Sequence, residues 1–551
     1  MSAGTTGSDA IAIALEKLGV TTVFAIPSAH NMPILRAIEG RTTIRIIGCR
    51  HEQGVAHAAD AYARTTGSLG VGVVSGGPGT ANAMGGMYEA HFASSPVLLI
   101  TSQVESAHLG RGRGYVHEAE NQREMLATVT REVVTETSVD DLADTVLRLA
   151  RQARRGRPRP VALEVPLDIQ TASVASFDGP GPGVGAAAPI PRSRPSAGPV
   201  EEAAQLMATA RRPVIWAGGG VIRSEASREL LALAHRWNAP VLTSREGRGA
   251  ISELDPLSIG AYATLPPVRD FLGECDVMLA VGTRFQMYPT AQWQLPIPDA
   301  LVHLDIDPTV IGRSYRAGIA LVGDAKAGLA ELSAVLADGS SDNGRSAHVV
   351  AGQRAAAAAR EIVAAQAGPD HLRISRAVAR HRPPDGVLVC DATVPAYVWG
   401  DRLVPIHRPR TSIRSAAAGI GPGMAMALGA AAGSSAHTVL LQGDGGFMLG
   451  IGELAAAVQA KSRIVVCLFD DGGYGMLRAI DAETAGVSTD SFALATPDFA
   501  TVASAFGAAS ARVADPDEFE QAFRTALGHD GPSLIHIDMN SMAPLQRTLG
   551  T

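Results

Sequence analysis

The sequence predicts an α/β protein made of three doubly wound domains, each built around a parallel sheet. Short apolar runs alternate along the chain with longer amphipathic segments, which is the pattern of buried parallel strands covered by helices. A chain of 551 residues is also too long for a single hydrophobic core. Two stretches rich in small and turn-forming residues interrupt the alternation, and they divide the chain into three pieces.

These interruptions are Phe177 to Pro199 and Ala337 to Ala347. We therefore expect an N-terminal domain over 1–178, a central domain over 200–338 and a C-terminal domain over 370–551. In doubly wound sheets, ligands bind at the carboxyl ends of the strands, so the loops that follow strands are the places to look for chemistry. The clearest expected strands are Leu69 to Ser75, Val97 to Thr101, Pro213 to Ala217, Val277 to Val281, Val387 to Cys390, Thr438 to Leu441 and Ile464 to Phe469.

The composition favours a small-molecule partner over a nucleic acid or a membrane. The formal net charge is -7, and no run of Lys and Arg is present to form a basic surface. The four cysteines are far apart, so neither a disulfide framework nor a CxxC metal site is expected. They are predicted to be buried thiols in a reducing compartment, and they are Cys49, Cys275, Cys390 and Cys467.

No export signal is expected, because Asp9 precedes any basic residue and the apolar stretch from Ala10 to Leu15 is too short for a signal sequence. This favours the cytoplasm. The uncharged segment from Ser415 to Ala436 has about the length of a membrane span. Its Ala, Gly, Met and Ser content, with Pro422 inside it, predicts a buried helix instead.

The most informative segment reads LLQGDGGFMLGIGELAAAVQAKSRIVVCLFDDGGYGML over 440–477. One strand is expected to end at Gln442 and to be followed by a glycine-rich turn around Asp444, with a helix that begins near Gly450. A second strand is expected to end beside Asp471. Two carboxylates at neighbouring strand ends suit Mg²⁺ held against phosphate oxygens. The alternative is that both aspartates simply cap or turn loops.

This segment resembles the thiamine-diphosphate-binding motif of the superfamily of acetolactate synthase, pyruvate and other 2-oxo acid decarboxylases, and benzaldehyde lyase. The motif begins with GDG and closes on an Asn pair, where this chain has Asp470-Asp471. The added negative charge is expected to weaken binding or to change the preferred divalent metal. The resemblance implies that Asp444, Asp471 and the carbonyl of Gly473 hold Mg²⁺. It also implies that the cofactor is contacted by Gly443, Asp444, Gly445, Gly446, Asp471, Gly473, Tyr474, Gly475 and Met476.

A second motif, GCRHEQGVAHAADAYAR over 48–64, places Glu52 after a strand and at the start of a helix. A Glu in that place is usually just favourable helix-dipole electrostatics. The motif resembles the pyrimidine-binding signature of the same superfamily, which implies that Glu52 binds ring nitrogen N1′ and promotes proton loss from thiazolium C2. In this family the glutamate reaches a cofactor whose diphosphate is held by another subunit. The resemblance therefore implies a homo-oligomer, at least a dimer, with a tetramer as the larger form.

Four further segments resemble cofactor and substrate loops of the superfamily. In RSAAAGIGPG, Ile420 would be the apolar wedge beneath the cofactor and Ala418 would lend its carbonyl to the 4′-amino group; the alternative is that Ile420 is merely core. FAIPSAHN and YVHEAEN place His30 and His117 near the reacting carbon as proton donors or orienting groups, although either could be structural. In SGGPGTANA, the pyrimidine and substrate side is lined by Gly79 and Asn82.

The middle piece, with RRPVIWAGGGVI, VGTRF and HLDIDP, resembles the central domain of the superfamily. Its glycine run from Gly218 to Gly220 lacks the GxGxxG spacing of a dinucleotide site. Acetohydroxyacid synthases hold FAD in this domain, but the segments GAYAT at Gly260 and RFQMYPTAQW at Arg284 match theirs poorly. FAD is therefore not expected.

The resemblance runs from about Ser8 to Met539 and implies an enzyme that decarboxylates a 2-oxo acid and ligates the product to a second carbonyl, as acetolactate synthases do. Leu477, where pyruvate decarboxylases have a glutamate, favours ligation, whereas an end at Thr551 lacks the longer arm of acetolactate synthases. One alternative is a non-ligating decarboxylase, because HEAENQ resembles guanidino-2-oxo-acid decarboxylases. The other is a catalytically silent homologue that binds thiamine diphosphate, against which the presence of Glu52 argues.

Overall fold

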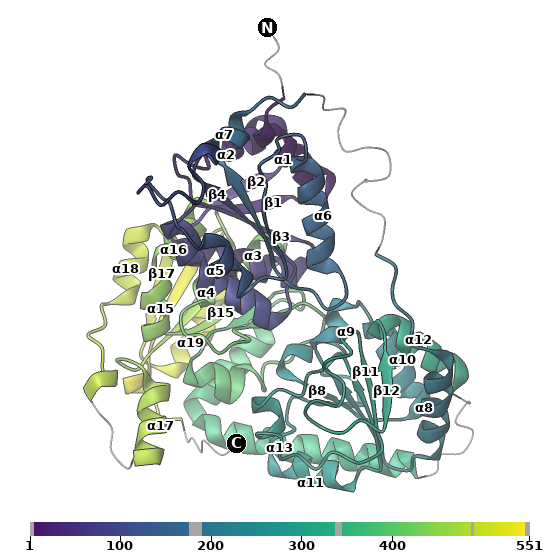
Figure 1. Cartoon of the computed structure of the whole chain (residues 1–551). Helices are drawn as coiled ribbons and strands as arrows, with labels where there is room; N and C mark the ends of the chain where they lie inside the picture. The colour runs from purple at the N-terminus through teal and green to yellow at the C-terminus, as the bar shows by residue number, and fades with distance from the viewer. Residues whose placement is uncertain (1–4, 176–189, 337–343, 486–489, 546–551) are drawn as a thin grey trace.

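The computed structural model describes residues 5–175, 190–336, 344–485 and 490–545. The described chain forms three six-stranded parallel sheets, one in each third of the sequence, and helices cover their faces (Figure 1). The N-terminal part packs against the C-terminal part, and the central part lies to the lower right in Figure 1. The predicted α/β class with three doubly wound parallel sheets is confirmed.

The N-terminal sheet has the strand order β2-β1-β3-β4-β6-β5. Its strands are β1 (Thr22–Ala25), β2 (Arg45–Gly48), β3 (Gly70–Val74), β4 (Val97–Gln103), β5 (Val133–Thr135) and β6 (Val161–Pro166). Its helices are α1 (Gly7–Lys17), α2 (Met32–Arg41), α3 (Glu52–Thr66), α4 (Pro78–Ala93), α5 (Gln122–Ala127), α6 (Leu142–Arg154) and α7 (Leu167–Thr171). A capping box between Thr6 and Asp9 starts α1, because each side chain bonds to the backbone amide of the other residue.

The central sheet has the order β12-β11-β10-β7-β8-β9. Its strands are β7 (Pro213–Ala217), β8 (Val241–Thr243), β9 (Ser258–Gly260), β10 (Val277–Val281), β11 (Leu301–Asp305) and β12 (Ile319–Val322). Its helices are α8 (Ala197–Thr209), α9 (Gly219–Arg223), α10 (Ser227–Trp237), α11 (Pro266–Glu274) and α12 (Ala325–Val335). The strands β7, β8, β10 and β11 are buried along their whole length, and β7 and β10 accordingly have continuous apolar sequences.

The C-terminal sheet repeats the N-terminal order, as β14-β13-β15-β16-β18-β17. Its strands are β13 (Leu388–Cys390), β14 (Ser412–Arg414), β15 (Thr438–Gly443), β16 (Ile464–Asp470), β17 (Ala509–Val513) and β18 (Ser533–Asp538). Its helices are α14 (Gly423–Ala432), α15 (Asp444–Gly450), α16 (Gly452–Gln459), α17 (Gly475–Ala485), α18 (Phe499–Phe506) and α19 (Pro516–Leu527). The seven strands expected from the sequence all form, and those at 213–217 and 277–281 have the expected ends.

A long helix, α13 (Arg345–His381), joins the central part to the C-terminal part along the lower edge in Figure 1. It bends at Gly368, which has a φ of 71°, and Pro369 follows without an amide hydrogen to donate. The segment before the bend packs on α11, and the helix also packs on α19. The domain limits expected from the sequence stay predictions.

Both predicted interruptions fall partly on residues 176–189 and 337–343, which lie outside the described residues. Both predicted interruptions end too late, because α8 begins at Ala197 and α13 begins at Arg345. The uncharged segment at 415–436 contains the buried helix α14 over its middle, as expected. Within the described residues, no helix has the length and apolarity needed to cross a bilayer. All four cysteines are buried and free, as predicted.

Helices α3 and α14 make the most extensive helix-to-helix contact between the N-terminal and C-terminal parts. A Cβ atom at Gly429 would overlap the carbonyl oxygen of Ala58, so the two backbones touch there. Around this crossing, Val55, Met424 and Leu428 belong to one shared hydrophobic core. The N-terminal and C-terminal sheets are therefore held together by apolar packing around α3 and α14.

This close approach predicts the effect of adding one methyl group. Gly429→Ala should lower the free energy of unfolding by about 1–3 kcal/mol, because the new Cβ meets backbone that cannot turn away. Gly40→Ala, on the exposed face of α2 with open space around it, is the matched control and should stabilise by about 0.4–1 kcal/mol. Urea unfolding of both variants checks the prediction, and an equal change in the two would contradict it.

Candidate active site

Two strand ends of the C-terminal sheet meet at the expected glycine-rich segment. Strands β15 and β16 pair in parallel, with Gly443 opposite Phe469, so Asp444 and Asp470 follow on neighbouring strand ends. The predicted turn after β15 is wrong, because α15 begins at Asp444 itself, whereas a second helix, α16, begins at Gly452, near the predicted start at Gly450. Gly443 is the N-cap of α15 and has an extended backbone conformation. The carboxylate of Asp444 in the first turn interacts favourably with the helix dipole.

The carboxylates of Asp444 and Asp471 repel each other electrostatically at this edge. Oδ2 of Asp444 accepts a hydrogen bond from the amide of Gly473 at 2.6 Å, and Oδ1 of Asp471 lies 3.0 Å from Nη2 of Arg478. Burial, with the charge of Asp471 added, raises the pKa of Asp444 to about 7. A divalent cation would relieve this repulsion, so the donor set fits Mg²⁺. The role of the Gly473 carbonyl stays a prediction, since the bond seen is from its amide.

The glycines of the loop are needed for its close packing. A Cβ at Gly475 would overlap Oδ2 of Asp471, and one at Gly445 would lie 2.8 Å from the ring of Tyr474. Gly473 has a φ of 147°, and a Cβ there would overlap the carbonyl oxygen of Phe492. At these three positions only glycine lets the loop pack this closely. Two other predicted contacts, Gly446 and Met476, lie in α15 and α17.

Asp470, which stands where the motif has its first Asn, turns toward the sheet. Its Oδ2 lies 2.9 Å from Nε2 of His536 on β18, and its Oδ1 accepts from the amide of Gly472 at 3.1 Å. Burial acts to raise the pKa of Asp470, but the bonds from His536 and Gly472 outweigh it and the net shift is downward. His536 and the amide of Gly472 therefore give the added carboxylate two hydrogen-bond partners. Sequence reasoning missed this histidine, since 66 residues separate the pair.

Asp391, directly after β13, is a second residue that the motifs did not indicate. Its buried carboxylate accepts hydrogen bonds from Nε2 of Gln442 at 2.7 Å and from the amide of Gly421 at 3.2 Å. Burial raises its pKa to about 6. These bonds tie the loop that carries Ala418 and Ile420 to β15. Ile420 is 37% exposed, so the alternative that it is merely core is wrong.

In the N-terminal part, Glu52 begins α3, as predicted. Its Oε2 accepts a hydrogen bond from Nδ2 of Asn82 at 3.0 Å. A Cβ at Gly79 would lie 3.3 Å from Oε1 of Glu52, so the glycine leaves room for the carboxylate. The structure thus brings together three residues that the sequence assigned to the pyrimidine side.

His30 and His117 also meet, although they come from two different loops. Their rings stack with centroids 4.5 Å apart, and Nδ1 of His117 lies 2.6 Å from Oγ of Ser75. Burial, and then the neighbouring His117, lower the pKa of His30. Gln122 holds the loop beside this pair, because its Oε1 accepts a hydrogen bond from the amide of Gly77. Gly77 packs directly against the backbone of His117, where a Cβ atom would lie 2.7 Å from the carbonyl oxygen. Ser75 and Gln122 were not predicted as site residues.

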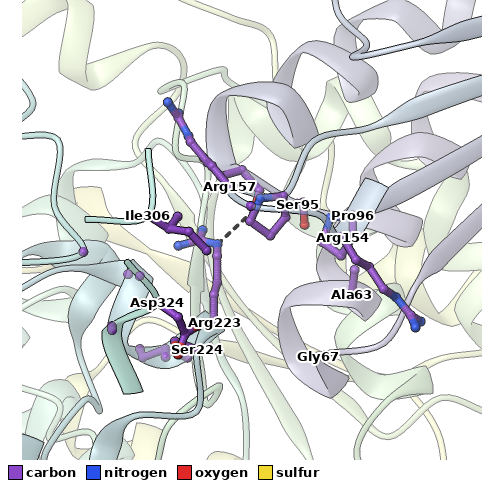
Figure 2. Close-up of a pocket in the computed structure, with 18 of the residues that line it drawn as sticks. Ala63, Gly67, Ser95, Pro96, Arg154, Arg157, Arg223, Ser224, Ile306 and Asp324 are labelled. Carbon is purple, nitrogen blue, oxygen red and sulfur yellow. Dashed lines mark hydrogen bonds between the residues drawn. The ribbon is translucent and has the colours of Figure 1, made fainter. Parts of the chain in front are cut away.

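A large cavity of about 1360 Å³ lies elsewhere, between the N-terminal and central parts. Figure 2 shows Arg154 and Arg157 approaching it from the first part and Arg223 and Ser224 from the second. Burial and neighbouring arginines lower the pKa of Arg223 to about 10 and of Arg284 to about 9, so cations are crowded here. The predicted site residues do not line this cavity.

Three family profiles match the chain in sequence order. They are the thiamine pyrophosphate enzyme N-terminal TPP binding domain over residues 5–125, the central domain over 200–332 and the C-terminal TPP binding domain over 395–537. The chain belongs to the thiamine pyrophosphate enzyme family. Thiamine pyrophosphate is another name for thiamine diphosphate, so the expected superfamily is confirmed.

Relatives within this family span almost the whole chain. A probable 2-ketoarginine decarboxylase of Pseudomonas aeruginosa is 35% identical over 543 residues, which cover 97% of this chain and 94% of the relative. The acetolactate synthase large subunit of Corynebacterium glutamicum is 30% identical, over 96% of this chain and 86% of its own. A crystal structure of a putative thiamin diphosphate-dependent enzyme from Mycobacterium smegmatis has a TM-score of 0.80 at 20% identity, covering 97% and 99% of the two chains, and shares the fold.

In this thiamine pyrophosphate enzyme, the stacked histidines give a measurable prediction. His117→Gln should raise the pKa of His30 toward its ordinary value but not fully restore it, because burial, the larger cause, remains. In the wild type, His30 should gain its proton at lower pH than an exposed histidine. NMR titration of protein with labelled histidine rings, assigned with His30→Gln, checks this. A His30 pKa that is unchanged in His117→Gln would contradict the arrangement.

Proposed function

We propose that the protein uses thiamine diphosphate and Mg²⁺ to decarboxylate a small 2-oxo acid and to ligate the product to a second carbonyl, as an acetolactate synthase does. The observation that carries the proposal is the pair of half-sites. Glu52 and Asn82 form one half in the N-terminal part, and the loop around Asp444 and Asp471 forms the other in the C-terminal part. The proposed domains are a pyrimidine-binding domain over 1–178, a central domain over 200–338 and a diphosphate-binding domain over 370–551.

The C-terminal half would hold the cofactor and its metal. Asp444, Asp471 and the carbonyl of Gly473 would bind Mg²⁺, and the amides of the glycine-rich segments would hold the diphosphate. When bound, thiamine diphosphate supplies an electron sink that makes the loss of CO₂ from a 2-oxo acid feasible. Ile420, on the loop next to α15, would pack beneath the cofactor. The carbonyl of Ala418 would accept a hydrogen bond from the cofactor's 4′-amino group.

The N-terminal half would carry the residues that transfer protons. Glu52 would hold a proton against N1′ of the pyrimidine, and the bond from Asn82 keeps its carboxyl group in place. His30 is neutral at neutral pH because its pKa is lowered, so it can accept a proton or orient a substrate oxygen. His117, anchored by Ser75, would hold the second position beside the reacting carbon.

Two observations bear on the choice between ligation and simple decarboxylation. Leu477, in the first turn of α17, puts an apolar side chain where pyruvate decarboxylases have a glutamate, and this favours ligation. Against it, the 35% identical relative is named a probable 2-ketoarginine decarboxylase, whereas the acetolactate synthases are 30% identical or less. A non-ligating decarboxylase of a 2-oxo acid is therefore the second candidate.

We also propose a homodimer as the smallest active form, with a tetramer as the larger assembly. Within one chain, Glu52 bonds to a residue of its own domain, Asn82. Beside the diphosphate loop, Ile420, Met448 and Leu449 are 37%, 43% and 63% exposed. A second copy would bury these side chains and bring its own Glu52 to the cofactor. FAD is not among the proposed cofactors, and a cytoplasmic location stays a prediction.

The proposal predicts that purified protein, given Mg²⁺ and thiamine diphosphate, releases CO₂ from at least one member of a panel of 2-oxo acids. The panel should include pyruvate and an acid with a guanidinium side chain, each with and without an aldehyde or second 2-oxo acid as acceptor. Mass spectrometry identifies the products. A 2-hydroxy ketone or acetohydroxy acid supports ligation, and a free aldehyde alone supports the second candidate.

Glu52→Gln is the matched control for this assay, because it keeps the size of the side chain and its bond to Asn82 but loses the acidic proton. It should slow turnover by about 100-fold or more while the protein still binds the cofactor. No CO₂ from any acid, in protein that binds thiamine diphosphate, would contradict the proposed reaction. Full activity in Glu52→Gln would contradict the role of Glu52.

A further inference from the structure

A buried glutamate from the C-terminal part reaches into the N-terminal half-site. Glu453 lies on α16, and its Oε1 accepts hydrogen bonds from the amides of Arg50 at 2.9 Å and His51 at 3.0 Å. These two amides stand directly before Glu52, at the point where β2 gives way to α3. The side chain of Glu453 therefore holds the turn from which the Glu52 carboxylate projects.

A second buried glutamate makes the opposite connection. Glu89 lies on α4 in the N-terminal part, and its carboxylate accepts from the amides of Ala416 at 2.6 Å and Ala417 at 3.0 Å. These amides stand directly before Ala418, which has a φ of 60° and leads to Ile420. Glu89 therefore holds the turn that presents the loop beneath the proposed cofactor.

The two contacts occupy equivalent places in the two domains. β3 and β15 hold the same position in sheets of the same strand order. Glu89 lies on α4, the helix after β3, and Glu453 lies on α16, the second helix after β15. The turns that receive the carboxylates precede α3 and α14, which follow the equivalent strands β2 and β14. The same interaction is thus made twice around the α3 and α14 crossing, once in each direction.

The receiving position for Glu453 is shaped to fit it. A Cβ at Gly54, in the first turn of α3, would overlap Oε1 of Glu453, so only glycine leaves room for the carboxylate. Glu453 is buried, and its Oε2 has no hydrogen-bond partner among the described residues. Burial raises its pKa, although the amides of Arg50 and His51 oppose the shift. Burial of a carboxylate is unfavourable unless it is hydrogen-bonded. Here the two charge-assisted hydrogen bonds from backbone amides offset that penalty and fix the position of the turn.

The surroundings of Glu89 differ in charge. The guanidinium of Arg64 lies 3.6 Å from Oε1 of Glu89, and it also pairs with Asp60 at 3.3 Å and Glu246 at 3.1 Å. Burial, with Asp60 added, raises the pKa of Glu89 to about 7 despite Arg64. Substitution of Glu89 would disturb this ion network as well as the loop, so Glu453 offers the cleaner test.

We infer that Glu453 and Glu89 are positioning residues, each of which aligns the cofactor-contacting residue of the other domain through two backbone amides. The inference rests on the proposed function for the meaning of Glu52 and Ile420, but the contacts themselves do not depend on it. In the proposed dimer, the Glu52 and the diphosphate loop of one chain serve different active sites. Each chain would therefore link two sites through these carboxylates.

Three variants test the inference for Glu453. Glu453→Ala removes the acceptor, Gly54→Ala displaces it from the other domain, and Glu453→Gln keeps an acceptor oxygen. In cofactor-free protein, amide hydrogen exchange of the peptide around Arg50 and His51 should speed up by about tenfold or more in the first two variants. It should stay near wild type in Glu453→Gln. Glu89→Ala is the reciprocal control and should speed exchange at Ala416 and Ala417 instead.

The second readout is hydrogen-deuterium exchange at C2 of bound thiamine diphosphate, followed by NMR after acid quench. It should fall by about 10- to 100-fold in Glu453→Ala and Gly54→Ala, because a small displacement of Glu52 is costly. Cofactor affinity from calorimetry should change much less, and Glu453→Gln should restore most of the rate. If cofactor affinity and the C2 exchange rate fell by the same factor in all variants, the role of Glu453 would be merely structural.

Unchanged amide exchange at Arg50 and His51 in both Glu453→Ala and Gly54→Ala would overturn the inference. If Glu453→Ala does not fold, the result for Gly54→Ala alone decides the inference, because this variant retains the carboxylates of both Glu52 and Glu453. If wild-type protein fails to bind thiamine diphosphate, the proposed function fails, whereas the amide measurement on cofactor-free protein still decides whether Glu453 orders the turn.

Discussion

The candidate site depends on the crossing of α3 and α14. Backbone meets backbone where Gly429 faces Ala58, so the distance between the N-terminal and C-terminal sheets is set by atoms that cannot rearrange. Helix α3 carries Glu52 at its first residue, and α14 follows the loop that carries Ile420. Any change in the crossing would move the two half-sites of the chain relative to each other. The buried glutamates Glu453 and Glu89 act on the same two helix starts.

Parallel sheets explain why the chemistry gathers where it does. The ends of β2 and β3 deliver Glu52 and Gly79, and the ends of β15 and β16 deliver Asp444 and Asp471. Each of these loops begins at a carboxyl strand end, where backbone amides and helix starts are free to face a ligand. The central sheet offers the same edge to the arginine-lined cavity, at a place remote from the predicted site residues.

Much of the fold could be predicted from the sequence, because buried parallel strands are continuous apolar runs and the expected strands formed at those runs. Local motifs likewise located Glu52, Asp444 and Asp471, since glycines and strand ends lie next to them in sequence. The helix start at Asp444 is not predicted, because a GDGG sequence is typical of a turn, whereas in the structure Asp444 begins α15.

The contacts that were missed are all distant in sequence. Asp391 binds Gly421 across 30 residues, His536 meets Asp470 across 66, and Glu453 reaches Arg50 across 403. No local pattern marks such partners, because each is a single polar residue in or directly after an ordinary strand or helix. Only the folded arrangement of the two domains shows that these side chains hold the loops of the site.

The most direct test of the central claim, that an active site combines halves from two chains, mixes two inactive variants. Chains with Glu52→Gln are unfolded and refolded, or co-expressed, together with chains that carry Asp444→Asn. In a mixed dimer, one site receives both substitutions and the other receives neither, so random mixing should restore about a quarter of wild-type activity. Mixed dimers, verified by mass, that show no activity above the separate variants would contradict the account.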